Sequence, residues 1–209
     1  MPVVCHARGE VHGTAHAPRP LRPRRRYDHH LHTARHIDTV FLDRDGVINR
    51  KAPDGDYIKS VSELELLPGV VDAVSLLQRA ELRLVIVTNQ RGIALGRMSA
   101  EAVAELHRDL GSRLGLAVDR IYVCPHGHGE CHCRKPEPGL LEQARADTPE
   151  IDFARSAVVG DSPSDVELAR RVGALAIGVG PRTSGADRVF DSLADASRWL
   201  VTAAARPPR

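Results

Sequence analysis

The chain has 209 residues, of which 42% are hydrophobic and 27% charged, and this suits one globular domain with a tail. The net charge of +2 is uneven: residues 1–36 hold seven arginines against two acids, and residues 37–209 are acidic, at about −3. No apolar run is long enough for a membrane span, and the N-terminus lacks the apolar core of a signal peptide. We therefore exclude a membrane protein and expect a cytoplasmic one.

Residues 1–36 differ in composition from the rest of the chain. They contain seven of the eleven histidines and few large apolar residues, so they cannot bury enough surface to offset the entropy cost of ordering. The Arg-Pro-Arg-Arg-Arg stretch at 22–26 is able to contact nucleic acid or an anionic surface, but a solvated tail is the simpler interpretation. We predict a disordered tail at 1–36, a single domain at 37–203 and a short C-terminal tail at 204–209.

The first element of the domain is an apolar run at 39–42, which predicts a buried strand, and Asp43 and Asp45 follow it directly. Carboxylates two residues apart at the end of a strand point the same way. One can attack while the other handles protons, which is the division of labour that covalent phosphoryl transfer needs. Taken alone, the segment is explained equally well by a strand that ends in an ordinary Asp-Gly turn.

Strands and helices then alternate along the chain. Apolar runs predict strands at 84–88, 121–123, 157–160 and 174–179, and helical patterns begin at or just after Pro68, Ser99, Pro138, Pro163 and Ser192. This alternation predicts an α/β fold with a doubly wound parallel sheet, which binds ligands at the carboxyl ends of its strands. Segments 46–87 and 89–133 are too short for a large additional domain, so only loops should shield those strand ends.

Three of the four cysteines lie within ten residues of one another, and in a reducing compartment such clustering indicates metal binding. These cysteines are Cys124, Cys131 and Cys133. Together with one histidine they offer enough ligands for a closed tetrahedral Zn²⁺ site with no position left for water. The candidates for the fourth ligand are His126, His128 and His132. Unlinked thiols on a surface loop are the alternative interpretation.

Four motifs occur in this order along the chain: Asp43-Arg-Asp45, the strand that ends at Thr88, Arg134-Lys135-Pro136, and Gly160-Asp161-Ser-Pro-Ser-Asp165. They resemble the motifs of the haloacid dehalogenase superfamily of phosphatases with an aspartate nucleophile. Three longer segments are more specific: Asp-Arg-Asp-Gly-Val-Ile-Asn, Thr-Asn-Gln-Arg-Gly-Ile-Ala, and Cys-Pro-His followed by Cys-His-Cys-Arg-Lys-Pro. Through them the chain resembles the branch of D-glycero-D-manno-heptose 1,7-bisphosphate 7-phosphatases within that superfamily. The resemblance covers roughly residues 37–200.

The resemblance implies the haloacid dehalogenase fold without a cap domain, and hydrolysis of a phosphate monoester through an aspartyl phosphate. Asp43 is then the nucleophile, and Asp45 is the general acid and base. Thr88 and Lys135 are the groups expected to bind the oxygens of the transferring phosphoryl group.

Two metals follow from the same resemblance. The implied Mg²⁺ ligands are the Asp43 carboxylate, the Asp45 backbone carbonyl and the Asp161 carboxylate, with Asp165 in a supporting role. Only His126 fits the matched zinc motif, so the implied Zn²⁺ ligands are Cys124, His126, Cys131 and Cys133. The zinc is expected to be structural and to hold the Arg-Lys pair that follows it next to the nucleophile.

The substrate implied is a small sugar phosphate, and Arg134 suits a planar, forked contact with its second phosphate. The full set of implied substrate contacts is Gly55, Asp56, Tyr57, Thr88, Asn89, Gln90, Arg91, Arg134 and Lys135. The sequence leaves open which anomer the enzyme prefers and which pathway uses the product, and we expect a monomer.

Two other functions compete with this hypothesis. The spacer between His126 and Cys131 is shorter than in many heptose bisphosphate phosphatases and closer to that of histidinol-phosphate phosphatases, which share the zinc loop. A zinc-stabilised nucleic-acid-binding protein is the alternative outside enzymes, because of the arginine-rich tail. The acidic balance of residues 37–209 and the 3% aromatic content oppose nucleic-acid binding, since it needs a basic face.

Overall fold

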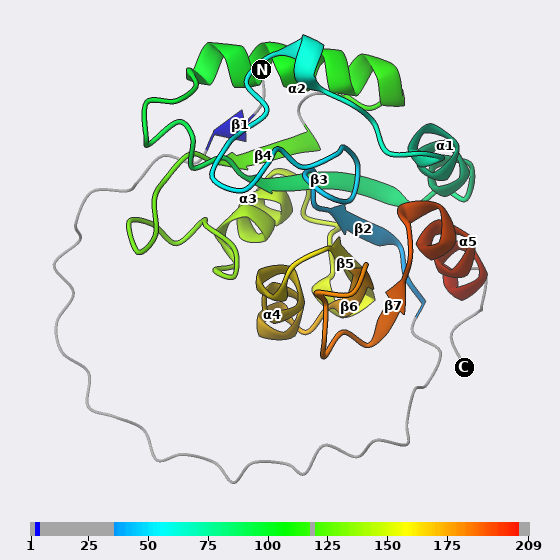
Figure 1. Cartoon of the computed structure of the whole chain (residues 1–209). Coiled ribbons are helices and arrows are strands. Elements are labelled where there is room, and N and C mark those ends of the chain that lie inside the picture. Colours follow the sequence, from blue (N-terminus) through cyan, green and yellow to red (C-terminus); the bar gives the residue numbers. More distant parts are fainter. Residues whose placement is uncertain (1–2, 5–35, 118–119, 205–209) are drawn as a thin grey trace, which may run out of the picture.

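A computed structural model describes residues 3–4, 36–117 and 120–204 (Figure 1). Its strands form one seven-stranded sheet in the order β1-β4-β3-β2-β5-β6-β7, and every neighbouring pair is parallel. The strands are β1 Val3–Val4, β2 Thr39–Leu42, β3 Arg83–Asn89, β4 Ile121–Cys124, β5 Ser156–Gly160, β6 Leu175–Val179 and β7 Arg188–Phe190. The predicted doubly wound parallel sheet is confirmed.

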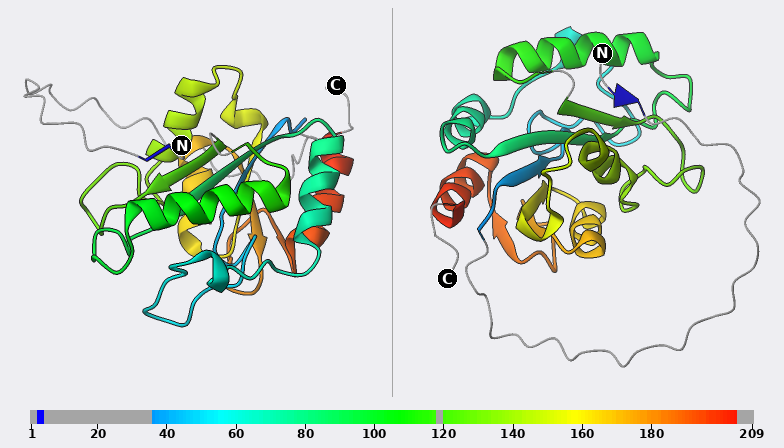
Figure 2. Two further views of the ribbon diagram at one scale, coloured as in Figure 1. Left: turned by 90° about the horizontal axis from the view of Figure 1, so that it is seen from above. Right: turned by 180° about the vertical axis from the view of Figure 1, so that it is seen from behind.

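Helices cover both faces of the sheet (Figure 1), and the same two layers can be followed from behind in Figure 2. One face carries α1 (Val70–Arg79), α2 (Ala100–Leu114) and α5 (Leu193–Ala204), and the other carries α3 (Gly139–Asp147) and α4 (Pro163–Val172). Short 3₁₀ turns lie at Val61–Glu63 and Phe153–Arg155. Because alternate strand side chains point to opposite faces, Leu42 packs in the first core cluster and Phe41 in the second.

Local sequence signals explain where the helices begin and end. Ser99 caps α2 by accepting a hydrogen bond from the Ala102 amide at 3.1 Å. In α4, Ser162 and Asp165 form a capping box, and Gly173 closes the helix with a φ of 76°, a conformation that favours glycine. The predicted starts of these two helices are therefore confirmed.

Two strands were not predicted from the sequence, β1 and β7. They have 2 and 3 residues and lie at opposite edges of the sheet, so they carry too little of a pattern to recognise. Apart from residues 3–4 and 36, the predicted N-terminal tail lies outside the described residues, as do residues 205–209 of the C-terminal one. Helix α5 continues to Ala204, one residue past the predicted end of the domain.

The topology fixes where a ligand can bind. From β2 the chain moves to β3 on one side and later returns to β5 on the other, so a crevice opens at the carboxyl end of β2. The described parts of segments 46–87 and 89–133 form only loops, one 3₁₀ turn and core elements, which agrees with the predicted absence of a cap domain. None of the helices within the described ranges has the length and apolar character needed to cross a lipid bilayer.

We predict that Ser99→Ala destabilises the domain by about 1 kcal/mol, because the amide of Ala102 loses its capping oxygen. Urea denaturation measures this change in the free energy of unfolding. Ser112→Ala is the matched control, since Ser112 is an exposed residue in the last turn of the same helix and makes no cap. Equal effects of the two substitutions would contradict the capping role.

Candidate active site

Three acids and one lysine meet at the carboxyl ends of β2 and β5. Asp43 follows β2, Asp161 follows β5, and Asp165 lies in the first turn of α4; their carboxylate oxygens lie within 4.8 Å of one another. The Lys135 Nζ atom is 2.7 Å from Asp43 Oδ1 and 2.7 Å from Asp165 Oδ1, and it donates to the Val87 carbonyl at 3.0 Å. The ammonium is therefore shared between two buried carboxylates.

The charges in this cluster shift one another's protonation. Burial raises the pKa of Asp43 to about 7, with Lys135 opposing the rise and Asp165 and Asp45 adding to it. Burial alone lowers the pKa of Lys135, but Asp165 and Asp43 outweigh it and raise that pKa above its usual value. Lysine thus stays cationic, while Asp43 needs positive charge nearby to remain ionised.

Asp45 is held by donors on both carboxylate oxygens. Arg44 Nη2 donates to both at 2.9 Å, Asn49 Nδ2 donates to Oδ1 at 2.9 Å, and Gln90 Nε2 donates to Oδ2 at 2.9 Å. Burial alone would raise the pKa of Asp45, but Arg44 and these hydrogen bonds hold it below its usual value. The Arg44 side chain itself is only 1% exposed. The orientation of Asp45 is therefore set by its neighbours.

Asn89 and Gln90, which were expected to contact substrate, are engaged inside the protein. Gln90 is 1% exposed and donates to Thr88 Oγ1 at 2.8 Å as well as to Asp45. Asn89 accepts from the Lys135 amide at 3.1 Å and donates to the Lys135 carbonyl at 3.3 Å. These contacts align the end of β3 with the lysine loop and with Asp45.

The loop at 55–57 lies outside this cluster. Gly55 and Asp56 are exposed, and Asp56 Oδ1 pairs with Lys59 Nζ at 2.6 Å. Tyr57 packs against Gly92, where an added Cβ would lie 2.9 Å from the Tyr57 ring. The loop thus contacts the segment that follows β3, and no side chain of residues 55–57 has a contact with the acid cluster among those the structure gives for described residues.

The two predicted arginines of the site remain partly exposed. The Arg134 guanidinium donates to the His126 carbonyl at 3.4 Å, a weak contact that ties it to the cysteine loop. The Nε atom of Arg91 is buried, and the described residues offer it no hydrogen-bond partner. Both guanidinium groups therefore retain donors for a ligand.

Sequence reasoning missed two cations on Asp161. Lys51 Nζ lies 2.6 Å from Asp161 Oδ2, and Arg182 Nη2 lies 3.2 Å from the same oxygen. Gly46 makes room for them, because an added Cβ there would lie 2.5 Å from Asp161 Oδ2 and the residue has a φ of 92°. A single Lys or Arg in a polar loop carries no signal in a lone sequence, since most such residues are solvated.

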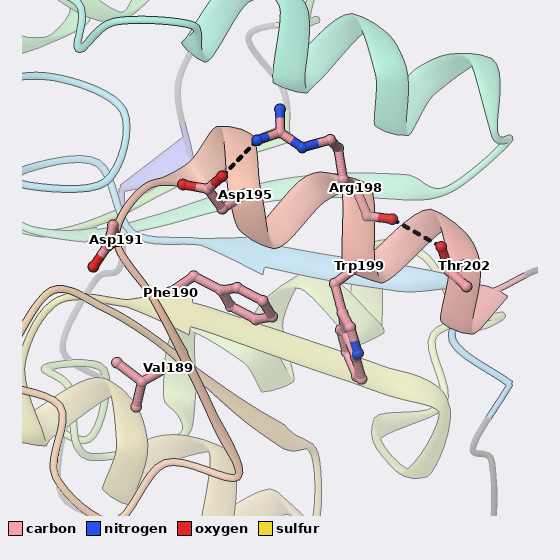
Figure 3. A pocket seen from close by; sticks show the side chains of 7 residues that line it. All are labelled: Val189, Phe190, Asp191, Asp195, Arg198, Trp199 and Thr202. Carbon is pink, nitrogen blue, oxygen red and sulfur yellow. Dashed lines mark hydrogen bonds and ion pairs between the residues drawn. The ribbon is translucent and has the colours of Figure 1, made fainter.

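A cavity of about 410 Å³ opens beside Asp161, bordered also by Gly46, Arg182 and the start of α5. A larger, more open hollow of about 590 Å³ lies between β7 and α5 (Figure 3). Phe190 and Trp199 line it, with ring centroids 6.0 Å apart, and Arg198 pairs with Asp195 at its rim. It contains none of the predicted site residues, so we place the active site at the acid cluster, where the reactive groups converge.

The acid cluster suits a hard divalent cation. Asp43, Asp161 and Asp165 offer carboxylate oxygens in a small volume, and oxygen ligands are those that Mg²⁺ prefers. Asp165 uses both carboxylate oxygens inside the protein, Oδ1 with Lys135 and Oδ2 with Ser162 of the α4 cap, whereas Asp43 contacts Lys135 through Oδ1.

The predicted zinc ligands come together in the loop after β4. Cys124 Sγ is 3.5 Å from Cys131 Sγ, Cys131 and Cys133 are 3.4 Å apart, and His126 Nδ1 is 3.3 Å from Cys133 Sγ. Tetrahedral zinc with bonds of about 2.3 Å places its sulfurs about 3.8 Å apart, so these separations fit a shared metal. His128 and His132 are exposed and stand outside the group.

The thiol chemistry agrees with a metal site. Hydrogen bonding with Cys133 lowers the pKa of Cys124 to about 5, although burial opposes this, so the thiolate form is favoured. Since sulfur and nitrogen ligands suit zinc and leave no open position, the four residues fit a structural ion.

Comparison with known proteins decides the family. A family model described as "HAD-hyrolase-like" matches residues 132–196. The D-glycero-alpha-D-manno-heptose-1,7-bisphosphate 7-phosphatase of Mycobacterium tuberculosis (strain ATCC 25618 / H37Rv) is 43% identical over 171 residues, which are 77% of this chain and 90% of the relative. This chain belongs to the haloacid dehalogenase superfamily, in the branch of heptose bisphosphate phosphatases.

Further relatives support the same branch of the haloacid dehalogenase superfamily. The D-glycero-beta-D-manno-heptose-1,7-bisphosphate 7-phosphatase of Escherichia coli (strain K12) is 37% identical over 78% of this chain and 93% of its own length. The crystal structure of the D,D-heptose 1,7-bisphosphate phosphatase of B. bronchiseptica, complexed with magnesium and phosphate, matches with a TM-score of 0.71 and 30% identity. That match covers 79% of this chain and 99% of the other. The chain is therefore a phosphoric monoester hydrolase.

We predict that Cys131→Ser lowers both the zinc content and the thermal stability of the purified protein, because one thiolate of a closed site is lost. Elemental analysis and thermal unfolding measure the two effects. His128→Ala is the matched control, since this exposed histidine of the same loop stands outside the four-residue group. Zinc-free wild-type protein, or full stability of the serine variant, would contradict a structural metal.

Proposed function

We propose that this protein is a Mg²⁺-dependent phosphatase that removes the 7-phosphate of D-glycero-D-manno-heptose 1,7-bisphosphate through an aspartyl-phosphate intermediate. The observation that carries the proposal is the contact of one buried lysine with Asp43 and Asp165 at the end of the central strand, beside Asp161. Relatives 37–43% identical to the chain bear the name of this activity.

In the first step an Asp43 oxygen attacks phosphorus while the bond from phosphorus to the sugar oxygen breaks. Asp45, whose pKa the negative charge of the bound phosphate would raise, gives its proton to that departing oxygen, so the sugar leaves as an alcohol. Lys135 and Thr88, which are both buried, would neutralise and orient the phosphoryl oxygens. These roles follow from reach and charge: Lys135 Nζ lies 2.7 Å from the attacking carboxylate.

In the second step water attacks the phosphorus of the aspartyl phosphate, and Asp45 takes its proton. The bond from Asp43 to phosphorus breaks, which releases inorganic phosphate and the free carboxylate. The Asp43 and Asp161 carboxylates and the Asp45 carbonyl would hold Mg²⁺. Its positive charge would reduce the repulsion between the Asp43 carboxylate and the phosphate.

Recognition of the substrate falls to loop residues, since no cap domain covers the site in the described chain. Arg134 and Arg91 have donors to spare, and the loop at 55–57 contacts the segment beside Arg91. We propose that Arg134 reads the distal phosphate of the substrate with its planar fork. The zinc site would then act at a distance from chemistry, by fixing the loop that carries Arg134 and Lys135.

Phosphate release should be fastest with one of the two anomers of heptose 1,7-bisphosphate, when these are compared with histidinol phosphate and simple sugar phosphates. Chelation by EDTA should abolish this turnover and added Mg²⁺ should restore it, because the acid cluster offers hard oxygen ligands. A colorimetric assay for inorganic phosphate measures the rates.

Asp43→Asn is the control for this screen, since an amide cannot form the acyl phosphate and turnover should fall to background with the fold intact. A wild-type enzyme that prefers histidinol phosphate would overturn the substrate assignment. That outcome would favour the runner-up function suggested by the short spacer between His126 and Cys131.

We predict that Arg134→Ala lowers kcat/KM for the heptose bisphosphate about ten- to hundredfold, the cost of one charge-assisted contact. Acetyl phosphate, which has no distal phosphate, should be affected much less. Arg134→Lys keeps the charge without the planar fork and should fall between wild type and alanine. Equal losses on both substrates would instead indicate damage to Lys135 or to the zinc loop.

A further inference from the structure

A buried chain of contacts runs from α2 into the proposed acid-base residue. His107 lies in α2, has no exposed surface, and its Nε2 atom is 2.9 Å from Arg44 Nη1. The same guanidinium contacts Asp45 through Nε at 3.3 Å and through Nη2 at 2.9 Å. His107 stands 63 residues beyond Arg44 in sequence, so only folding brings the three side chains together.

The contact between His107 and Arg44 has a defined chemistry. Burial, together with the charge of Arg44, lowers the pKa of His107 to about 3 although Asp45 opposes the change, so the imidazole is neutral. Since Arg44 can only donate, Nε2 must be the acceptor and Nδ1 carries the ring proton. The Nη1 donor of Arg44 therefore faces the lone pair of His107 Nε2, which can accept its hydrogen bond.

The other side of the ring shows that the histidine is not there for packing alone. Its Nδ1 atom is buried and has no hydrogen-bond partner among the described residues. Such an unpaired buried donor destabilises a fold, whereas leucine would fill a similar volume with no polar group. The neighbours of His107 on this helix face are apolar, namely Val103, Leu106, Leu110 and Leu114. The feature that distinguishes His107 from them is the acceptor that it turns toward Arg44.

Arg44 needs this acceptor to hold Asp45 in one orientation. Arg44 lies in the bend that follows β2, and its side chain contacts the carboxylate of the next residue in the chain. A long side chain held only by that carboxylate would retain several rotamers. With Nη1 fixed by His107, the guanidinium plane is set, and its fork sets the plane of the Asp45 carboxylate. Asn49 and Gln90 complete the arrangement.

We propose that His107 is a positioning residue for the reaction, which through Arg44 aims the Asp45 carboxyl group at the oxygen of the leaving alcohol. This inference rests on the proposed general-acid role of Asp45. Proton transfer is sensitive to small displacements of the donor, so loss of the contact should slow only those reactions whose leaving group requires a proton.

Dependence on the leaving group tests the inference. For His107→Leu we expect kcat/KM to fall about tenfold or more on the alkyl phosphate that the wild type hydrolyses best, and less than about threefold on acetyl phosphate. Acetate is a stable anion and can leave without a proton, whereas the oxygen of a sugar alcohol needs a proton as it leaves. The parameter kcat/KM covers only the steps up to release of the leaving group, so the later use of Asp45 as a base does not enter.

Two further variants separate positioning from packing. His107→Gln offers an amide oxygen near the place of Nε2 and should restore most of the loss, although it is no better than leucine at filling the site. Arg44→Lys keeps the positive charge but cannot span His107 and Asp45 together, so it should reproduce the selective loss even if the leucine variant fails to fold. Circular dichroism and thermal unfolding establish that each variant is folded.

Asp45→Asn distinguishes failure of this inference from failure of the proposed mechanism. If Asp45→Asn loses activity selectively on the alkyl phosphate while His107→Leu and Arg44→Lys lose it equally on both substrates, the acid role stands and the positioning role of His107 is overturned. If Asp45→Asn itself shows no selectivity, the general-acid role falls and the inference falls with it. Selective losses on the alkyl phosphate in Asp45→Asn, His107→Leu and Arg44→Lys, with activity restored in His107→Gln, support both the general-acid role of Asp45 and the positioning role of His107.

Discussion

The structure of the site depends on one buried ammonium. Lys135 contacts Asp43 at the end of β2, Asp165 at the start of α4 and the Val87 carbonyl in β3, and it thereby joins three parts of the chain. Removing one member of such a buried ionic group leaves an uncompensated charge, so the members must be placed together. The Asn89 side chain bonds to both the backbone amide and the backbone carbonyl of Lys135. The last residue of the cysteine cluster, Cys133, lies two residues before Lys135. The loop that carries the cysteine cluster is therefore connected to Asp43 through the Lys135 side chain.

The same charges prepare the site for an anionic substrate. Burial raises the pKa of Asp43 to about 7, and charge repulsion from the Asp165 and Asp45 carboxylates adds to the rise. Lys135 relieves it on one side, and Lys51 and Arg182 relieve it at Asp161. A phosphate group brings further negative charge, which only added positive charge can accommodate. An acid cluster of this kind thus favours a divalent cation and a phosphate together over either one alone.

The polar residues of the site divide into those that make internal hydrogen bonds and those that stay partly exposed. Gln90 bonds to Asp45 and Thr88, and Asn89 bonds to the Lys135 backbone. Arg134, near the zinc loop, remains partly exposed at the rim. Under the mechanism proposed above, this division would let the loops change with the substrate while the inner hydrogen bonds keep Asp43 and Asp45 aligned.

The sequence by itself determined the parallel α/β fold, the order of its core elements and the candidate reactive groups. Apolar strands ending in Asp43, Thr88 and Asp161 can be recognised locally, as can three cysteines within ten residues, because each depends on short-range spacing. Only the tertiary structure decided which polar residues hold these groups. His107 reads as one more position on the buried face of α2, and Lys51 as a solvated loop residue, until folding sets them beside Arg44 and Asp161. Contacts between segments 63 and 110 residues apart arise from how helices and loops pack on the sheet, and no local pattern encodes them.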